Sequence, residues 1–301
     1  MLTTIICWLI HCLLVLLAVA FFTLFERKVI GLFHIRLGPN KVSFIGIVQP
    51  LLDAFKLLSK QNIVPLRANK FSYNVAPIRA LFLSLFVWIT MPSMYFVTSL
   101  NYSLVIFFCV SSILVFSVLI AGWSSNSKYS LIGRLRSVAQ SISYESVFST
   151  LLVLILFINI SYSIRRFQSF SSLLNIYLII IWVICVLAET HRAPFDFRES
   201  ESELVSGFNT EYSGVYFAFI FLSEYGVLLY SCILIYYIFF SFVFTSVPFI
   251  IIVTLIFSFV FIWIRITFCR FRYDLLIIMS WKIILPCSLI FYLIYVSISI
   301  L

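Results

Sequence analysis

Charged residues, glycines and cofactor motifs are all scarce in this chain. Of its 301 residues only 10% are charged and 63% are apolar, and the mean hydropathy is +1.15. A water-soluble domain carries about 25% charged residues, so this composition excludes one. The eight glycines form no G-x-G-x-x-G loop, and the three histidines are too few and too scattered to hold a pair of haems. We therefore expect no redox cofactor within the chain itself.

Cysteine motifs are also missing. The seven cysteines form no C-x-x-C pair and have no spacing typical of a metal site, and almost all of them lie within long apolar runs. They are therefore predicted to be small buried hydrophobic residues, and we predict no disulfide framework, iron–sulfur cluster or metal site.

The apolar residues gather in runs that match the length of a transmembrane helix, which is about 20 residues. We therefore expect an all-α integral membrane protein with a single membrane domain over residues 1–301. The run 143–164 begins with polar residues, and the run 173–188 is short. The amino terminus lacks the arginines and serines of a transit peptide, so the first run is expected to be a span. The eight expected spans lie near 3–24, 78–98, 104–121, 143–164, 173–188, 214–239, 248–264 and 283–300.

Charges are distributed unevenly between the loops, which we number by the span that each follows. All Lys and Arg residues except Arg165 and Arg166 belong to loops 1, 3, 5 and 7. The positive-inside rule then places these odd loops in the matrix or cytoplasm and both termini on the opposite side. All eleven acidic residues belong to odd loops or to the adjoining ends of spans. We therefore expect chemistry and partners on the inner side.

Loop 1 contains an amphipathic pattern that predicts an interfacial helix. Apolar residues repeat at i, i+3 and i+4 from Phe44 to Leu58, and Asp53 and Lys56 lie on the opposite face. Gly38-Pro39 and Pro65 bound the segment. Such a helix commonly lies in the lipid headgroup layer. The alternative is that Asp53 borders a polar cavity.

Loop 5 is the densest cluster of ionisable residues. Six of the eleven acids lie between Glu189 and Glu211, among them Glu199, Glu201 and Glu203. Carboxylates this close raise one another's proton affinity. Phenylalanine, leucine and valine residues interleave them, which favours a segment packed inside protein over a solvated loop.

Two further carboxylates, Glu145 and Glu224, fall within expected spans. A charge at mid-bilayer costs at least about 2.5 kcal/mol, so such groups usually face the bundle interior and serve ion or proton movement. Either could instead be a neutral acid in a helix–helix hydrogen bond. Phe217, Phe221 and Tyr225 share a helical face with Glu224, which suits a flat quinone, although aromatic stripes are more often plain packing.

Several segments together resemble subunit 1 of respiratory complex I, which is called the H subunit in bacteria. The resemblance covers nearly the whole chain, with the segments in the right order. Its most specific parts are ESELVSGFNTEY, which follows PFDF, and GWSSNSKY. The segments are LFERKVIGLFHIRLGPNKV (24–42), QPLLDAFKLLSK (49–60), GWSSNSKYSLIGRLRSVAQSISYE (122–145), ETHRAPFDFRESESELVSGFNTEYSG (189–214), FLSEYG (221–226) and WIRITFCRFRYDLLIIMSWKIILP (263–286).

The resemblance implies a membrane subunit with eight helices in the mitochondrial inner membrane, at the junction with the peripheral arm of a proton-pumping NADH:ubiquinone oxidoreductase. Ubiquinone would be the substrate, and NADH, FMN and the iron–sulfur clusters would be bound by partner subunits. The implied partners are peripheral subunits around the quinone pocket, antiporter-like membrane subunits and lipid, but no nucleic acid. By motif match, the quinone-tunnel residues would be Arg27, Arg36, Asp53, Phe217, Phe221, Tyr225 and Arg265.

The same resemblance implies a chain of groups that couple quinone reduction to proton translocation. These residues are Glu26, Arg136, Glu145, Glu189, Arg192, Asp196, Glu199, Glu201, Glu203 and Glu224. The chain departs from the family pattern at His191, where Asn is general, at Arg198, where a small residue is usual, and at Ser200, where Gly is usual. These departures bear on the proton path, not on the resemblance.

Two alternatives remain open from the sequence. The homologous membrane subunit of a membrane-bound hydrogenase shares the expected fold without a quinone. An independent ion-coupled transporter would show inverted repeats and broken helices, and the chain has no self-similar halves.

Overall fold

The computed structural model describes residues 2–91, 101–159, 162, 164, 173–196, 211–240 and 247–300. Within these ranges the chain is entirely helical apart from turns and loops, as the sequence predicts. The elements are α1 (Leu2–Phe33), α2 (Gln49–Ser59), α3 (Lys70–Val87), η1 (Trp88–Thr90), α4 (Ser103–Ser125), α5 (Lys128–Asn159), α6 (Leu173–Glu189), α8 (Gly214–Ile235), η4 (Tyr236–Phe240), α9 (Val247–Thr267), α10 (Tyr273–Ile278), η5 (Met279–Ile284) and α11 (Leu285–Ile300).

Seven stretches of the described chain are long and apolar enough to cross a membrane. They are α1, α3 with η1, α4, α5, α8 with η4, α9, and the continuous run α10–η5–α11. The helix α6 is apolar but shorter. Each of the eight expected spans overlaps one of these helices, and the largest difference in boundary is at α5, which begins at Lys128. Its first half carries too many polar residues for a hydropathy pattern to detect, yet it packs among neighbouring helices.

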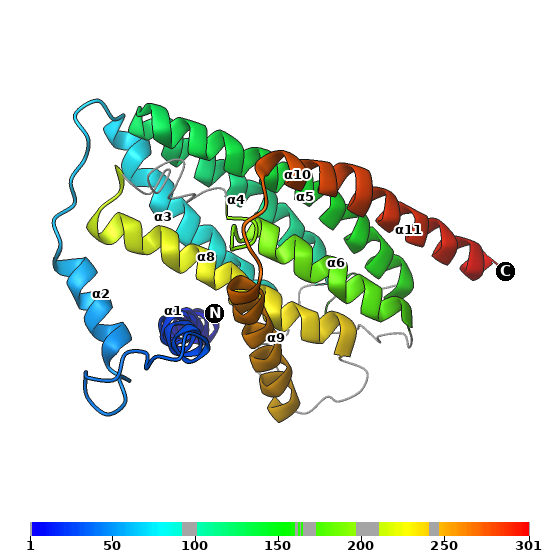
Figure 1. The fold of residues 1–301 in the computed structure, drawn as a ribbon, viewed down its shortest axis with the longest axis horizontal. Helices are drawn as coiled ribbons and strands as arrows, with labels where there is room; N and C mark the ends of the chain where they lie inside the picture. Colours follow the sequence, from blue (N-terminus) through cyan, green and yellow to red (C-terminus); the bar gives the residue numbers. More distant parts are fainter. Residues whose placement is uncertain are drawn as a thin grey trace.

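Figure 1 shows how the helices form one bundle. The helices α3, α4, α5, α6 and α8 run alongside one another, and α2 lies at the edge. In this view α1 is seen along its axis beside α8, so it crosses the bundle steeply. Helix α1 contacts α8, α9 and α2. It therefore connects the bundle to the interfacial helix.

The odd loops meet at one end of the bundle. The Asn69 N–H donates a hydrogen bond to the Ser124 carbonyl at 2.9 Å, which joins loops 1 and 3. The Ile63 N–H donates to Ser213 Oγ at 3.0 Å, which joins loops 1 and 5. The Phe271 N–H donates to the Pro194 carbonyl at 3.1 Å, which joins loops 5 and 7. The helices thus alternate in direction as the charge pattern predicts, and their orientation across the membrane stays a prediction.

The interfacial helix α2 begins later than the apolar pattern suggests. The stripe starts at Phe44, but the helix starts at Gln49. The reason lies in the preceding turn, where Ile45 and Gly46 have positive φ values of 57° and 77°. A Cβ at Gly46 would lie 2.2 Å from the Pro39 carbonyl oxygen, so this close turn requires glycine. The helix can then begin, because Pro50 is tolerated in a first turn.

Helix α8 begins with a cap supplied from loop 1. Asn62 Oδ1 accepts a hydrogen bond from the Val215 N–H at 3.0 Å. The preceding Gly214 has a φ of 55°, and a Cβ there would lie 2.5 Å from the Asn62 oxygen. A distant asparagine therefore satisfies a free N–H of this helix terminus.

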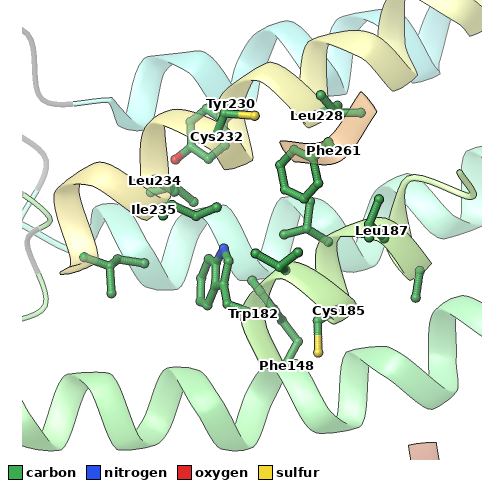
Figure 2. Packing of buried hydrophobic residues seen from close by; sticks show 14 of the residues in the cluster. Phe148, Trp182, Cys185, Leu187, Leu228, Tyr230, Cys232, Leu234, Ile235 and Phe261 are labelled. Carbon is green, nitrogen blue, oxygen red and sulfur yellow. The ribbon is translucent and has the colours of Figure 1, made fainter. Parts of the chain in front are cut away.

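A large buried hydrophobic cluster includes residues of α5, α6 and α8 (Figure 2). Trp182 of α6 is fully buried, and its ring centroid lies 4.6 Å from that of Phe148 on α5. Cys185 and Cys232 are buried in the same region. The prediction of buried cysteines is right for these two and for Cys12, but Cys7, Cys109 and Cys269 are exposed on the surface of this chain. Among the described residues, no group of His, Cys, Asp and Glu could hold a metal ion.

Candidate functional site

A buried ion network surrounds Glu26, which lies on α1 and is only 6% exposed. The Tyr225 hydroxyl on α8 donates to Glu26 Oε2 at 2.7 Å. Arg265 on α9 donates through Nη1 to Glu26 Oε1. Arg192, in the turn after α6, places Nη1 3.8 Å from the same oxygen. We call these four residues the Glu26 cluster.

Arg192 is the most enclosed cation of the Glu26 cluster. Its guanidinium lies 4.0 Å from the centroid of the Tyr225 ring, a cation–π contact. Burial opposes the charge, but the neighbouring Tyr225, Glu26 and Glu224 outweigh burial, and the pKa of Arg192 is raised. Arg192 therefore stays charged. The cluster lines a cavity of about 260 Å³, its open side included, together with Phe22, Leu187, Leu228, Phe261 and Ile262.

A second ion pair lies next to this cluster but on the outside. Arg27 Nη1 is 2.7 Å from Asp53 Oδ2, which joins α1 to α2. Gln49 Nε2 donates to the other oxygen of Asp53 at 2.9 Å. The Arg27 side chain is 54% exposed and that of Asp53 is 36% exposed. The polar face of α2 thus points towards the end of α1, while its apolar residues Phe55 and Leu58 are exposed.

The remaining quinone-tunnel candidates are more dispersed. The rings of Phe217 and Phe221 on α8 are 4.4 Å apart and tilted by 46°. Both are partly buried and pack against hydrophobic clusters, so packing accounts for part of this aromatic face. Arg36 is exposed in the turn after α1, where its N–H donates to the Gly31 carbonyl at 2.9 Å.

A larger cavity lies between α3, α4, α5, α6 and α8. It has an empty volume of about 940 Å³, its open side included. Its walls are mainly apolar, but the carboxylates Glu145, Glu189 and Glu224 line it together with Arg134 and His191. We call it the acid-lined cavity. Three of the predicted proton-coupling residues, from α5, α6 and α8, are therefore brought together.

The turn 189–192 connects the two sites. Glu189, Thr190 and His191 line the acid-lined cavity, and the next residue, Arg192, reaches the Glu26 cluster. The turn closes α6 because the Arg192 N–H donates to the Leu187 carbonyl at 3.2 Å and His191 has a φ of 51°. His and Asn both adopt positive φ more readily than most residues, so His191 suits this position as Asn would.

Two side chains at this site were not among the predicted residues. Gln140 on α5 is fully buried and donates through Nε2 to the carbonyls of Ala188 and Phe195, at 3.0 and 2.8 Å. Arg134, which the sequence placed among loop charges, is only 2% exposed. A Cβ at Gly122 would lie 1.9 Å from Arg134 Cγ, so glycine on α4 makes room for the side chain. The only feature of the sequence that could have indicated these two residues is that they are polar side chains within the segment that forms α5.

Other predicted residues lie apart from both cavities or outside the described ranges. The Arg136 guanidinium is 5.9 Å from the centroid of the Tyr273 ring on α10. Asp196 Oδ2 is 3.5 Å from Arg270 Nη2, which joins loops 5 and 7. Glu199, Glu201 and Glu203 lie outside the described ranges, so their shared titration stays a prediction. Arg198 and Ser200, where the chain departs from the family pattern, also lie outside these ranges.

Comparison with known proteins gives one consistent family. A family model described as NADH dehydrogenase matches residues 6–296. NADH-ubiquinone oxidoreductase chain 1 of Heterololigo bleekeri is 48% identical over 289 residues, covering 93% of this chain and 92% of the relative. The proteins of the same name from Aedes aegypti and Monodelphis domestica are 45% and 40% identical, and each alignment covers at least 93% of both chains.

These identities extend over nearly the entire chain, and the fold has the apolar helices of a multi-pass membrane protein. The chain therefore belongs to the family of NADH-ubiquinone oxidoreductase chain 1, the membrane subunits of mitochondrial complex I in the inner membrane.

Proposed function

We propose that this subunit forms part of the ubiquinone site of complex I and passes the charge change of quinone reduction into the membrane domain. The observation that carries the proposal is the turn 189–192, which has one end in the acid-lined cavity and the other on Glu26. Peripheral subunits would complete the quinone pocket and supply electrons, and antiporter-like subunits would continue the proton path.

The Glu26 cluster suits the quinone side of this function. Two arginines and one carboxylate give it a formal charge of plus one when Glu26 is ionised. Reduction of a quinone adds two electrons and then two protons, so negative charge develops on the headgroup before protonation. Fixed cations and the Tyr225 hydroxyl near that charge would stabilise it in a site with little water. Arg27 and Asp53 would line the same tunnel nearer its opening.

Arg192 suits the role of link between the two sites. Its side chain lies 3.8 Å from Glu26, and Glu224 of the acid-lined cavity also contributes to the raised pKa of Arg192. When Glu26 becomes neutral, the Arg192 guanidinium would lose its attraction to Glu26, shift towards Glu224 and stabilise a charge there more strongly. A coupling of one pKa unit corresponds to about 1.4 kcal/mol, and couplings of about 1–3 kcal/mol are typical between linked sites.

The test is Arg192→Met in assembled complex I, with Lys128→Met as the matched control on an exposed residue. We expect quinone reduction and proton uptake into sealed vesicles to fall together in the Arg192 variant. NADH oxidation by hydrophilic acceptors should persist in both variants, because flavin chemistry would lie in another subunit. Wild-type quinone reduction and pumping in the Arg192 variant would contradict the proposed link.

A further inference from the structure

We propose that Gln140 is a positioning residue of complex I, whose amide holds the turn 189–192 in register with α5. In this role Gln140 keeps Arg192 on Glu26 and Glu189 in the acid-lined cavity at the same time. The inference rests on the proposed function of Arg192 and assigns no contact between Gln140 and the quinone.

The side-chain amide of Gln140 bridges the two ends of the turn. Gln140 Nε2 has two hydrogens, and it donates to a carbonyl on each side of the turn, Ala188 at 3.0 Å and Phe195 at 2.8 Å. All three residues are at most 3% exposed. The last carbonyls of a helix lack intrahelical partners, and here the Ala188 carbonyl accepts both from Gln140 and, at 3.3 Å, from the His191 N–H of the turn. One amide therefore ties both ends of the turn to the same point on α5.

The orientation of the amide follows from its surroundings. Both neighbours are carbonyl oxygens, which only accept hydrogen bonds, so the NH₂ group must face them. Within the described part of the chain, Gln140 Oε1 is buried and has no hydrogen-bond partner. A buried acceptor left in this way is unfavourable. The contribution of Gln140 therefore lies in its two donated hydrogen bonds, which an apolar residue could not make.

The other contacts of the turn hold it to itself and to loop 7, and at one end also to α5, where the ring centroid of Tyr144 lies 6.0 Å from that of Phe195. Phe195 stacks on Phe271 with ring centroids 5.7 Å apart, and the Phe195 N–H donates to the Arg192 carbonyl at 2.8 Å. These contacts hold the far end of the turn to loop 7 and to itself. Gln140 adds hydrogen bonds from α5 to both ends of the turn, and α5 is the helix that also carries Glu145 into the acid-lined cavity. A displacement of about 1 Å in a group that positions the reactants can lower the rate of an enzyme steeply.

The decisive variant is Gln140→Glu, which keeps the shape and changes the donors. A neutral carboxyl group has one O–H and can keep one of the two hydrogen bonds, whereas an ionised carboxylate has none and faces two carbonyl oxygens. We expect quinone reduction by the assembled enzyme to fall by about tenfold or more. The loss should grow as the pH rises, which a purely structural defect would not show. The control is Gln61→Glu, the same change at an exposed position.

A second variant, Gln140→Asn, covers the case in which Gln140→Glu does not assemble. Its shorter amide can reach only one of the two carbonyls, so we expect a smaller loss of quinone reduction without added pH dependence. Assembly is read from a native gel with NADH-activity staining. The proposal is overturned if either assembled variant matches Gln61→Glu in rate and pH profile, or if neither assembles, because Gln140 is then a folding residue. A silent Arg192→Met variant would instead overturn the proposed function.

Discussion

Glu26 and Arg27 are adjacent on α1, yet they belong to opposite environments. Glu26 is 6% exposed and contacts residues from α8, α9 and the turn after α6. Arg27 has a side chain that is 54% exposed and pairs with Asp53 of α2. Successive residues point about 100° apart around a helix, so one step along the chain turns from the core to the surface. Charge at this site is therefore divided into a buried network and a solvent-exposed pair.

The two arrangements should differ in energy as well. Removing one partner from a buried ion pair typically costs about 3–5 kcal/mol, because a charge remains without compensation. An exposed pair contributes about 0–1 kcal/mol and is weakened by salt. Three experiments test this difference.

The largest effect is expected from Glu26→Gln, because it leaves Arg192 and Arg265 close together without their shared carboxylate. We expect the free energy of unfolding to fall by about 3–5 kcal/mol, seen as less assembled complex and faster thermal inactivation. Quinone reduction should be lost with it. The control is Asp274→Asn, which breaks an exposed pair with Arg272 of 3.1 Å. Equal effects of the two variants would contradict the distinction between buried and exposed charge.

An intermediate effect is expected from Tyr225→Phe. This change removes the hydrogen bond to Glu26 but keeps the ring beneath Arg192. Hydrogen bonds to charged groups contribute about 1.5–3 kcal/mol, so stability should fall by less than in Glu26→Gln. We expect quinone reduction to slow by about tenfold, the rate equivalent of about 1.4 kcal/mol. The measurement is the quinone reductase rate beside the exposed control Tyr129→Phe, and an unchanged rate would remove Tyr225 from the site.

The smallest effect on stability is expected from Arg27→Ala and Asp53→Ala. A double-mutant cycle on thermal inactivation should give a coupling of about 0–1 kcal/mol that decreases with added salt. Quinone reduction should nevertheless be impaired, because both residues would line the tunnel opening, while NADH oxidation by hydrophilic acceptors stays largely intact. If both activities fell together in assembled enzyme, the local role of this pair would be wrong.

Most of the helices could be predicted because the bilayer imposes length and hydropathy on each of them. The prediction was least accurate where a helix is polar, as at the start of α5, or where a turn overrides an apolar pattern, as at Gly46 before α2. Pairings such as Tyr225 with Glu26 could not be predicted from spacing, since 199 positions separate the two residues. The family resemblance supplied both residues but not their contact.

The sequence by itself determined the class of this protein and the side on which its charges gather. Hydropathy and charge asymmetry are properties of composition and order, so no packing is needed to detect them. The tertiary structure decided which charges meet. It buried Glu26 beside Arg192 and Arg265, left Arg27 at the surface, and brought Gln140 against the turn that joins the two cavities. The physical reason is that burial and hydrogen bonding depend on the angle and depth of each helix among its neighbours, which the linear pattern does not contain.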